Sequence, residues 1–199
     1  MTPREWRSSG RRRREILEAA ARLYLREGEE QLTIGRLAQE SEASVGSIYH
    51  HFKNKEHLLG GLVREILKGY RDQLVQQLEQ VHGAEAMVKT VVRHHLLWVD
   101  ANRNLARLLH QARKTPPVTA GDSDLRRSTG QFLKGLKERF LPYIQAGQVM
   151  RAPLPVFQAI LIGPAHELAR NVLSGRCPDV DLVGAADILA EAAWKAVKL

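Results

Sequence analysis

Apolar residues recur at every third or fourth position along most of the chain, which is the period of an α-helix with one buried face. In residues 12–28 they fall at Ile16, Ala19, Ala20, Leu23 and Tyr24. The same spacing predicts further helices at about 34–40, 45–51, 55–81, 84–100, 102–114, 122–146, 154–175 and 181–198. No stretch alternates apolar and polar residues for long enough to indicate a strand. The pattern therefore predicts an all-α protein.

Helix starts and stops divide this pattern into two parts. Thr33, Ser44 and Asn54 each precede a predicted helix and are residue types that cap helix N-termini, whereas Gly28 is expected to end the first helix. Later breaks are rich in Gly and Pro: TPPVTAGD (115–122), GQVMRAP (147–153) and GRCPDV (175–180). We expect an N-terminal three-helix domain at 1–57 and a larger helical domain at 58–199.

The two short helices at 34–40 and 45–51 are joined by a tight turn, an arrangement typical of a helix-turn-helix. Only Ile48 and Phe52 anchor the second helix, so most of its surface is available to enter a DNA major groove. Ser44 and Ser47 can donate hydrogen bonds to phosphate, and Gly46 lets the backbone approach DNA closely. The remaining polar groups of the segment are Tyr49, His50, His51, Lys53 and Lys55. Tyr49 has an alternative role as a packing residue, and His50 is equally compatible with contacting a partner helix.

The stretch LTIGRLAQESEASVGSIYHHFKNKEHLL, residues 32–59, resembles the DNA-binding signature of the tetracycline-repressor (TetR) family. The likeness covers roughly residues 12–65. It implies a cytoplasmic, all-α homodimer that binds double-stranded operator DNA and leaves it when a small molecule binds the C-terminal domain. It also implies a recognition helix at about 45–51. By this resemblance the usual contacts fall on Thr33, Val45, Gly46, Ser47, Tyr49, His51 and Lys55.

Two positions depart from the family pattern. Glu42 stands in the turn where the family usually has Gly. If that residue is left-handed, Glu costs on the order of 1 kcal/mol relative to Gly. Gly35 stands near the start of the first helix, where longer side chains often reach DNA, so one contact is expected to be missing.

Charge and cysteine content are compatible with this interpretation without requiring it. The net charge is +8 and the isoelectric point is about 9.9. Residues 1–14 hold six arginines and one acidic residue, which predicts a disordered tail that is either solvated or condensed on DNA phosphate. The single cysteine, Cys177, excludes an internal disulfide and fits a reducing cytoplasm. We find no secretory signal and no apolar run long enough to span a membrane.

Enzyme and metal interpretations have little support. The stretch HELAR at 166–170 has Arg170 where a zinc protease motif needs its second histidine. His94 and His95 are adjacent on a helix and point about 100° apart, so they do not easily serve one metal. We therefore expect no catalytic residues, no metal and no cofactor, and an all-α enzyme using a C-terminal cavity is the alternative from another class.

The C-terminal helices suggest a ligand site and a dimer surface. Residues placed to line a pocket for a small hydrophobic or aromatic effector are His94, His95, Trp98, His110, Phe132, Phe140 and Phe157. The last two helices are rich in small residues that let helix axes approach closely. The dimer residues expected there are Gly163, His166, Ala169, Leu173, Ala185, Leu189 and Ala192. A regulator without any small-molecule effector is the alternative within the same class.

Overall fold

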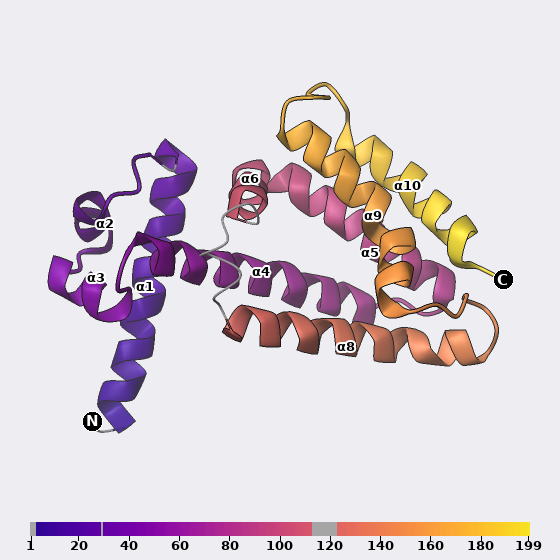
Figure 1. Ribbon diagram of the computed structural model, residues 1–199, viewed down its shortest axis with the longest axis horizontal. Helices are drawn as coiled ribbons and strands as arrows, with labels where there is room; N and C mark the ends of the chain where they lie inside the picture. Colours follow the sequence, from indigo (N-terminus) through magenta and orange to yellow (C-terminus); the bar gives the residue numbers. More distant parts are fainter. Residues whose placement is uncertain (1–2, 29, 113–122) are drawn as a thin grey trace. The chain divides into compact units, whose positions relative to one another are not determined.

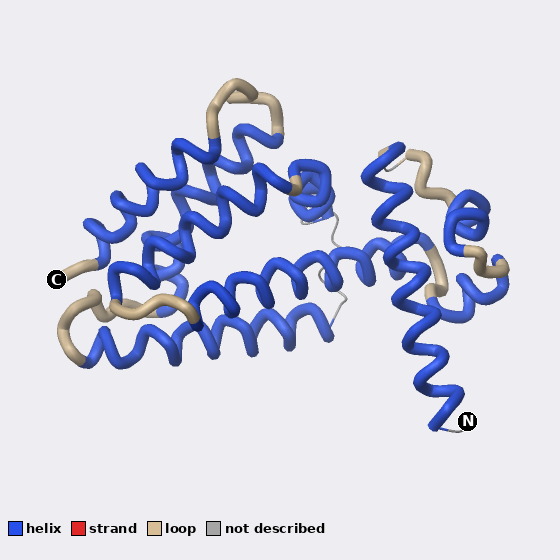
Figure 2. The backbone as a smooth tube through the Cα atoms, turned by 180° about the vertical axis from the view of Figure 1, so that it is seen from behind, coloured by secondary structure: helices blue, strands red, loops and turns tan. Residues whose placement is uncertain are grey.

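The computed structural model describes residues 3–28, 30–112 and 123–199. Within those residues it consists of helices and no strand, as Figures 1 and 2 show, which confirms the all-α prediction. The helices are α1 (Pro3–Glu27), α2 (Ile34–Ser41), α3 (Val45–His51), α4 (Lys55–Glu79), α5 (Ala84–Ala101), α6 (Arg103–Ala112), α8 (Ser123–Gln145), α9 (Leu154–Leu173) and α10 (Leu182–Val197). The predicted break at 115–122 lies outside the described residues. None of the described helices combines the length and the hydropathy that crossing a bilayer requires.

The chain forms two compact units. The first contains the residues up to Leu67 together with Gln111, Ala112 and Ser123. Within it the Tyr24 hydroxyl donates a hydrogen bond to the Gln111 amide oxygen at 3.3 Å. The second contains Lys68–His110 and Asp124–Leu199. Helix α4 therefore begins in the first unit and ends in the second. The predicted domain boundary at residues 57 and 58 stays a prediction.

The N-terminal segment corrects one expectation. Residues 3–14 are the first turns of α1, so the prediction of a disordered tail is wrong for them. Arginine is a good helix former, and Glu15 forms ion pairs with Arg11 at 3.4 Å and Arg12 at 3.0 Å, one turn away on the same helix. These local pairs extend a helix whose later turns are fixed by the core.

The first unit is built on the buried face of α1. Ile16, Ala20 and Leu23 are almost completely buried, and α2 and α3 each contribute one fully buried residue, Leu37 and Ile48. In Figure 1, α2 and α3 both lie beside α1. Gly28 ends α1 in a left-handed conformation with φ 85°, as its sequence position predicts.

In the second unit, α5 packs against both α9 and α10, and the three helices lie side by side in Figures 1 and 2. The core of this group combines large residues of α5 with small ones of the two later helices. Its fully or almost fully buried members include Val88, Val92, Leu96, Ala165, Ala169, Ala186 and Ala190. The last turns of α4 run alongside α8, where Arg139 on α8 pairs with Glu79 at 3.4 Å.

Candidate nucleic-acid interface

Helix α3 has one face buried in the core of the first unit and another exposed to solvent. Ile48 and Phe52 are 0% and 1% exposed, whereas Val45 and Tyr49 are 47% and 50% exposed. Half of an aromatic side chain and half of a valine thus face solvent on a helix of seven residues. These two side chains are therefore accessible to a molecule that contacts α3.

Three helix N-termini of this unit carry side-chain caps, as the sequence predicts. Ser44 Oγ accepts from the Ser47 amide at 3.1 Å, Thr33 Oγ1 accepts from the Arg36 amide at 3.3 Å, and Asn54 Oδ1 accepts from the His57 amide at 2.9 Å. A hydroxyl that accepts a hydrogen bond can still donate its own hydrogen to a phosphate oxygen. The capping role of Thr33 and Ser44 is therefore compatible with the phosphate contact expected of them, which stays a prediction.

The turn between α2 and α3 contains a strained residue. Glu42 has φ 51° and ψ 28°, and it is the only non-glycine residue with positive φ in the described ranges. The condition under which Glu at this position costs stability relative to Gly is therefore met. Arg12 Nη2 donates a hydrogen bond to the carbonyl oxygen of Glu42 at 3.4 Å. An arginine of α1 thus stabilises the turn that sets the angle of α3.

The other expected DNA contacts lie around α3 and the start of α4. Gly46 is exposed and Ser47 is half-buried on α3, Lys53 is exposed in the following turn, and Lys55 is half-buried as the first residue of α4. Because the free amide groups at a helix N-terminus favour anions, the start of α4 adds to the positive character of this edge.

His50 and His51 end α3 with their rings in contact, at a centroid distance of 5.2 Å. His50 is exposed and His51 is half-buried. Partial burial, reinforced by the positive charges of His50, Arg13 and Arg12, lowers the pKa of His51 below its ordinary value of 6.5. The neutral form of the His51 imidazole is therefore favoured near neutral pH.

Sequence reasoning missed three residues that position this surface. Arg12 contacts the turn, and the Arg13 guanidinium lies over the Phe52 ring, 5.0 Å from its centroid. A β-carbon on Gly61 would lie only 3.0 Å from Phe52 Cε1. The signal for Gly61 was its place beside Leu58 and Leu62 on the buried stripe of α4, where a side chain would normally be expected.

The comparisons with known proteins agree with this geometry. Residues 16–62 match the model of the family described as bacterial regulatory proteins, tetR family. These residues are therefore similar to the DNA-binding part of TetR-family regulators. The transcriptional regulator HbdR of Aromatoleum sp. (strain CIB) is 30% identical over 105 residues, which are 52% of this chain and 45% of that protein. The transcriptional repressor AcnR of Corynebacterium diphtheriae is 46% identical over 54 residues, 27% of this chain and 28% of that protein.

Solved structures extend the likeness to the fold of both units. The transcriptional regulator FadR from Bacillus subtilis, solved in complex with stearoyl-CoA, has a TM-score of 0.69 and 20% identity over 92% of this chain and 97% of that one. Identity at that level supports the fold alone. This chain spans less than half the length of the two curated relatives, HbdR and AcnR. The TetR family model lies within the first unit, and the second must be interpreted from its own residues.

The structure groups three of the expected effector residues around Tyr70. His94 is buried and its Nε2–H donates to the Tyr70 carbonyl oxygen at 2.9 Å, while the Tyr70 hydroxyl lies 3.3 Å from His95 Nδ1. Trp98 packs edge-on against the Tyr70 ring at 5.2 Å. Burial lowers the pKa of His94, and its hydrogen bond to the Tyr70 backbone opposes that effect in part.

The other expected effector residues lie apart from this group. Phe140 and Phe157 are buried against each other at 5.5 Å, as ordinary core residues are. Phe132 lies on α8 beneath the Arg71 guanidinium at 5.3 Å, and His110 is half-buried on α6. Their role in an effector site stays a prediction.

The expected dimer residues differ in exposure. His166 and Ala192 are exposed, and Gly163, Leu173, Ala185 and Leu189 are half-buried. Ala169, in contrast, is 3% exposed within the protomer itself, so it offers little surface to a partner. Ile188, which we did not expect from the sequence, is 71% exposed on α10.

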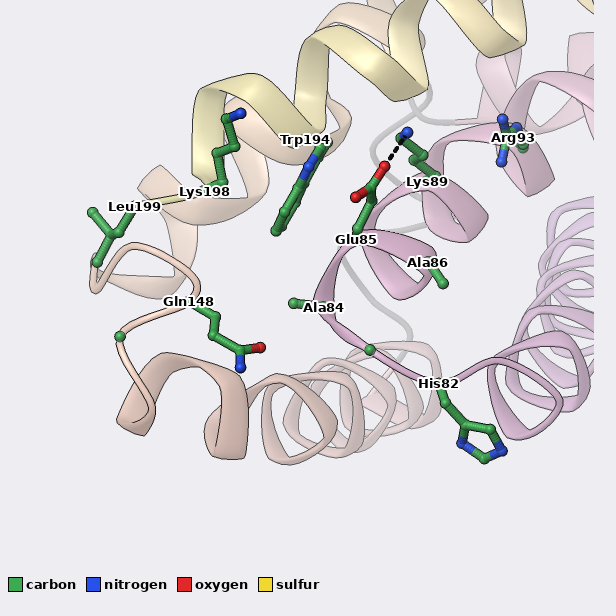
Figure 3. A pocket seen from close by; sticks show the side chains of 12 residues that line it. His82, Ala84, Glu85, Ala86, Lys89, Arg93, Gln148, Trp194, Lys198 and Leu199 are labelled. Carbon is green, nitrogen blue, oxygen red and sulfur yellow. Dashed lines mark hydrogen bonds and ion pairs between the residues drawn. The ribbon is translucent and has the colours of Figure 1, made fainter.

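A surface pocket of about 760 Å³ lies where α10, the start of α5 and the turn after α8 meet (Figure 3). Its lining includes Glu85, Lys89, Gln148, Trp194 and Lys198, and none of the expected effector residues. Lys89 pairs with Glu85 and, at 2.6 Å, with Glu191 on α10. This ion-paired cluster lies beside the apolar side chains of Trp194 and Leu199, so the lining combines charged and apolar groups.

Proposed function

We propose that the protein is a cytoplasmic transcriptional repressor that binds double-stranded operator DNA as a homodimer and is released by a small hydrophobic or aromatic effector. The main support is α3, a short capped helix with a buried Ile48 and an exposed Tyr49, within the residues that match the TetR family model. A helix of this size presented by a helix-turn-helix fits a major groove.

The groups around α3 divide between phosphate and base contacts. The DNA backbone is expected to be contacted by the hydroxyl of Ser44, the phenol of Tyr49 and the ammonium group of Lys55. Contacts of this kind position a protein on DNA without recognising its sequence. Val45 and Gly46, in the first turn of α3, supply the apolar and close-approach contacts that favour particular base edges.

Two copies of the chain are required for a symmetric operator, because half-sites lie one helical turn, about 34–36 Å, or a multiple of it apart. We place the dimer contact on α9 and α10. The exposed apolar side chains Val156, Val183 and Ile188 on these helices support that assignment. A hydrophobic face of this kind is stable in water when a second copy covers it.

The effector is assigned to the second unit, with the His94, His95 and Tyr70 group as polar handles beside Trp98. The B. subtilis FadR structure holds stearoyl-CoA, so long acyl compounds are the first class to test. The effector acts only if it binds the two conformations with different affinity, and a coupling of about 1–3 kcal/mol changes operator affinity roughly 5–150-fold. Helix α4 belongs to both units and is the element through which we expect that coupling to pass.

The test is binding to the DNA upstream of the protein's own gene at two salt concentrations. We expect Lys55→Ala to weaken binding to all sequences alike and to reduce the salt slope by about one unit. Lys137→Ala, at an exposed position on α8, is the matched control and is expected to bind as the wild type does. Equal affinity of Lys55→Ala, Tyr49→Phe and wild type would contradict the site.

Addition of acyl compounds to the protein–DNA complex then distinguishes a repressor controlled by an effector from a regulator without one. Release of the DNA supports the effector-controlled repressor. Binding that no compound weakens, together with no thermal shift from a broad set of hydrophobic compounds, favours a regulator without a small-molecule effector.

A further inference from the structure

The pocket between the start of α5 and the end of α10 has walls that hydrogen bonds to the backbone hold together. The Met150 amide donates to the Val197 carbonyl oxygen at 2.8 Å, which joins the segment after α8 to the end of α10. The Gly83 amide donates to the Tyr143 hydroxyl at 3.2 Å, which joins the start of α5 to α8. The pocket is therefore bordered by segments that are fixed before a ligand binds, and such preorganisation favours binding.

Figure 3 shows which side chains face this space. Trp194 extends from α10, Gln148 from the turn after α8 and Ala84 from the first turn of α5, and all three line the pocket. The Lys198 amide donates to the Trp194 carbonyl oxygen at 3.0 Å, so Lys198 lies one turn beyond Trp194 on the same side of α10. Residues at this spacing have β-carbons roughly 5–6 Å apart. An indole ring and an ammonium group are thus neighbours along one wall.

The charges around the pocket leave one of its cations without a counter-ion. Lys89 pairs with two carboxylates, of which Glu191 on α10 lies at 2.6 Å. Arg93 pairs with Asp187 of the same helix at 2.5 Å. In the part of the chain that the structure describes, no carboxylate pairs with the exposed Lys198 ammonium group. The charge that remains uncompensated at this pocket is therefore positive, and it lies beside Trp194.

We propose that this pocket binds a planar aromatic molecule that carries a single carboxylate group. The ring packs on the Trp194 indole, and the carboxylate lies beside the Lys198 ammonium group, with the Gln148 side-chain amide as a second donor. A monoanion is favoured over a polyphosphate, because a second negative charge would lie near Glu85 and Glu191. The volume of about 760 Å³ is in the range of small-molecule sites and admits a bicyclic ring.

This site is separate from the effector site that we assign around Tyr70. The residues that line the pocket do not include Tyr70, His94, His95 or Trp98. Occupancy of the pocket also requires no DNA. The inference therefore goes beyond the proposed function, and it can be tested on the free protein.

The probe is naphthoate, and the neutral naphthamide is the matched ligand because it has the same ring system without the charge. The chain contains three tryptophans, and heteronuclear NMR of the full chain follows their indole N–H signals. The variants Trp194→Leu and Trp98→Phe assign two of these signals. We expect naphthoate to shift the Trp194 signal and to bind up to about fivefold more tightly than naphthamide, which is the range for one solvent-exposed ion pair.

Three variants separate the contributions of charge and ring. Lys198→Gln is expected to weaken naphthoate binding by up to about fivefold and to leave naphthamide binding unchanged. Lys195→Gln makes the same change at an exposed residue of α10 that does not line the pocket, so it is the matched control and is expected to bind naphthoate as the wild type does. Trp194→Leu is expected to weaken both ligands by about two- to tenfold, because ring packing does not depend on the charge.

Several results overturn the inference. The comparison of the two ligands uses the wild type alone, so equal affinity for naphthoate and naphthamide overturns it whether or not the variants fold. A shift of the Trp98 signal in place of the Trp194 signal assigns the ligand to the Tyr70 group and has the same consequence. So does the absence of naphthoate binding at millimolar concentration, or equal naphthoate affinity of wild type and Lys198→Gln. Failure to bind DNA contradicts the proposed function alone, because ligand binding is measured in the free protein.

Discussion

The two units begin their helices in different ways. In the first, α2, α3 and α4 start at Thr33, Ser44 and Asn54, whose side chains accept a backbone hydrogen bond. In the second, α5 and α9 start at Gly83 and Pro153 without such a bond, although α10 is capped by Asp181. Local hydrogen bonds thus define the geometry of α3, whereas packing defines most of the second unit. A DNA-binding surface needs helix ends fixed by local hydrogen bonds, because a small change in the angle of α3 would displace all of its contacts with DNA.

A second difference between the units lies within α4, at Gly61 and Gly69. Gly61, in the first unit, is surrounded by side-chain atoms of Phe52, Arg13 and Leu17, which lie 3.0–3.1 Å from the position that a β-carbon would take. Gly69, in the second unit, has no such atom within 4 Å of the equivalent position. A side chain at Gly61 would crowd these atoms, whereas Gly69 is exposed and has room for one.

Substitution at these glycines should give the largest difference between the units. We expect Gly61→Ala to destabilise the protein by about 1–3 kcal/mol, because the extra methyl group overpacks the contact with the buried Phe52 ring. Gly69→Ala should instead stabilise it by up to about 1 kcal/mol through helix propensity. Urea unfolding of both variants provides the comparison, and equal effects at the two positions would refute the assigned packing.

A smaller effect is expected in the turn before α3. Glu42→Gly should raise the free energy of unfolding by about 1 kcal/mol, because glycine adopts the left-handed conformation without a steric cost. Glu42→Ala has a β-carbon like the native residue, and so it should not show this gain. If both variants unfold at the same denaturant concentration, the backbone at residue 42 is not the source of strain.

The smallest predicted effect belongs to the second unit and depends on pH. Burial lowers the pKa of His94 in the folded protein, so the unfolded chain binds more protons as the pH falls below about 6.5. The free energy of unfolding should therefore have its full value above that pH and decrease as the pH falls toward the lower pKa of His94 in the folded protein. Melting temperatures measured between about pH 7.5 and about pH 5 should show a shallower decline for His94→Gln than for the wild type. An identical decline would assign the effect to other groups.

More of the first unit than of the second could be predicted from the sequence, because its helix caps depend on neighbouring residues. Features that depend on contacts between distant residues could not be predicted in either unit. The caps were predictable because each depends on residues within one turn. The strain at Glu42 was raised only as a condition, because the family resemblance places Gly at that position. The helical state of residues 3–14, the Arg12 contact with Glu42 and the close packing at Gly61 depend on partners that only the fold brings near. In the second unit the periodicity predicted helices, but it could not show that His94 and His95 would lie around Tyr70 while Phe140 and Phe157 form a separate buried pair.

In the proposed dimer, the α3 helices of the two protomers each contact one half of a symmetric operator. Hydroxyl-radical footprinting of the wild-type protein on its own upstream DNA tests it most directly. We predict two equivalent protected half-sites whose centres are separated by one helical turn, about 34–36 Å, or a whole multiple of it. We also predict that Tyr49→Ala weakens protection in both halves equally. Protection of a single asymmetric site, or protection that Tyr49→Ala leaves unchanged, would contradict the claim.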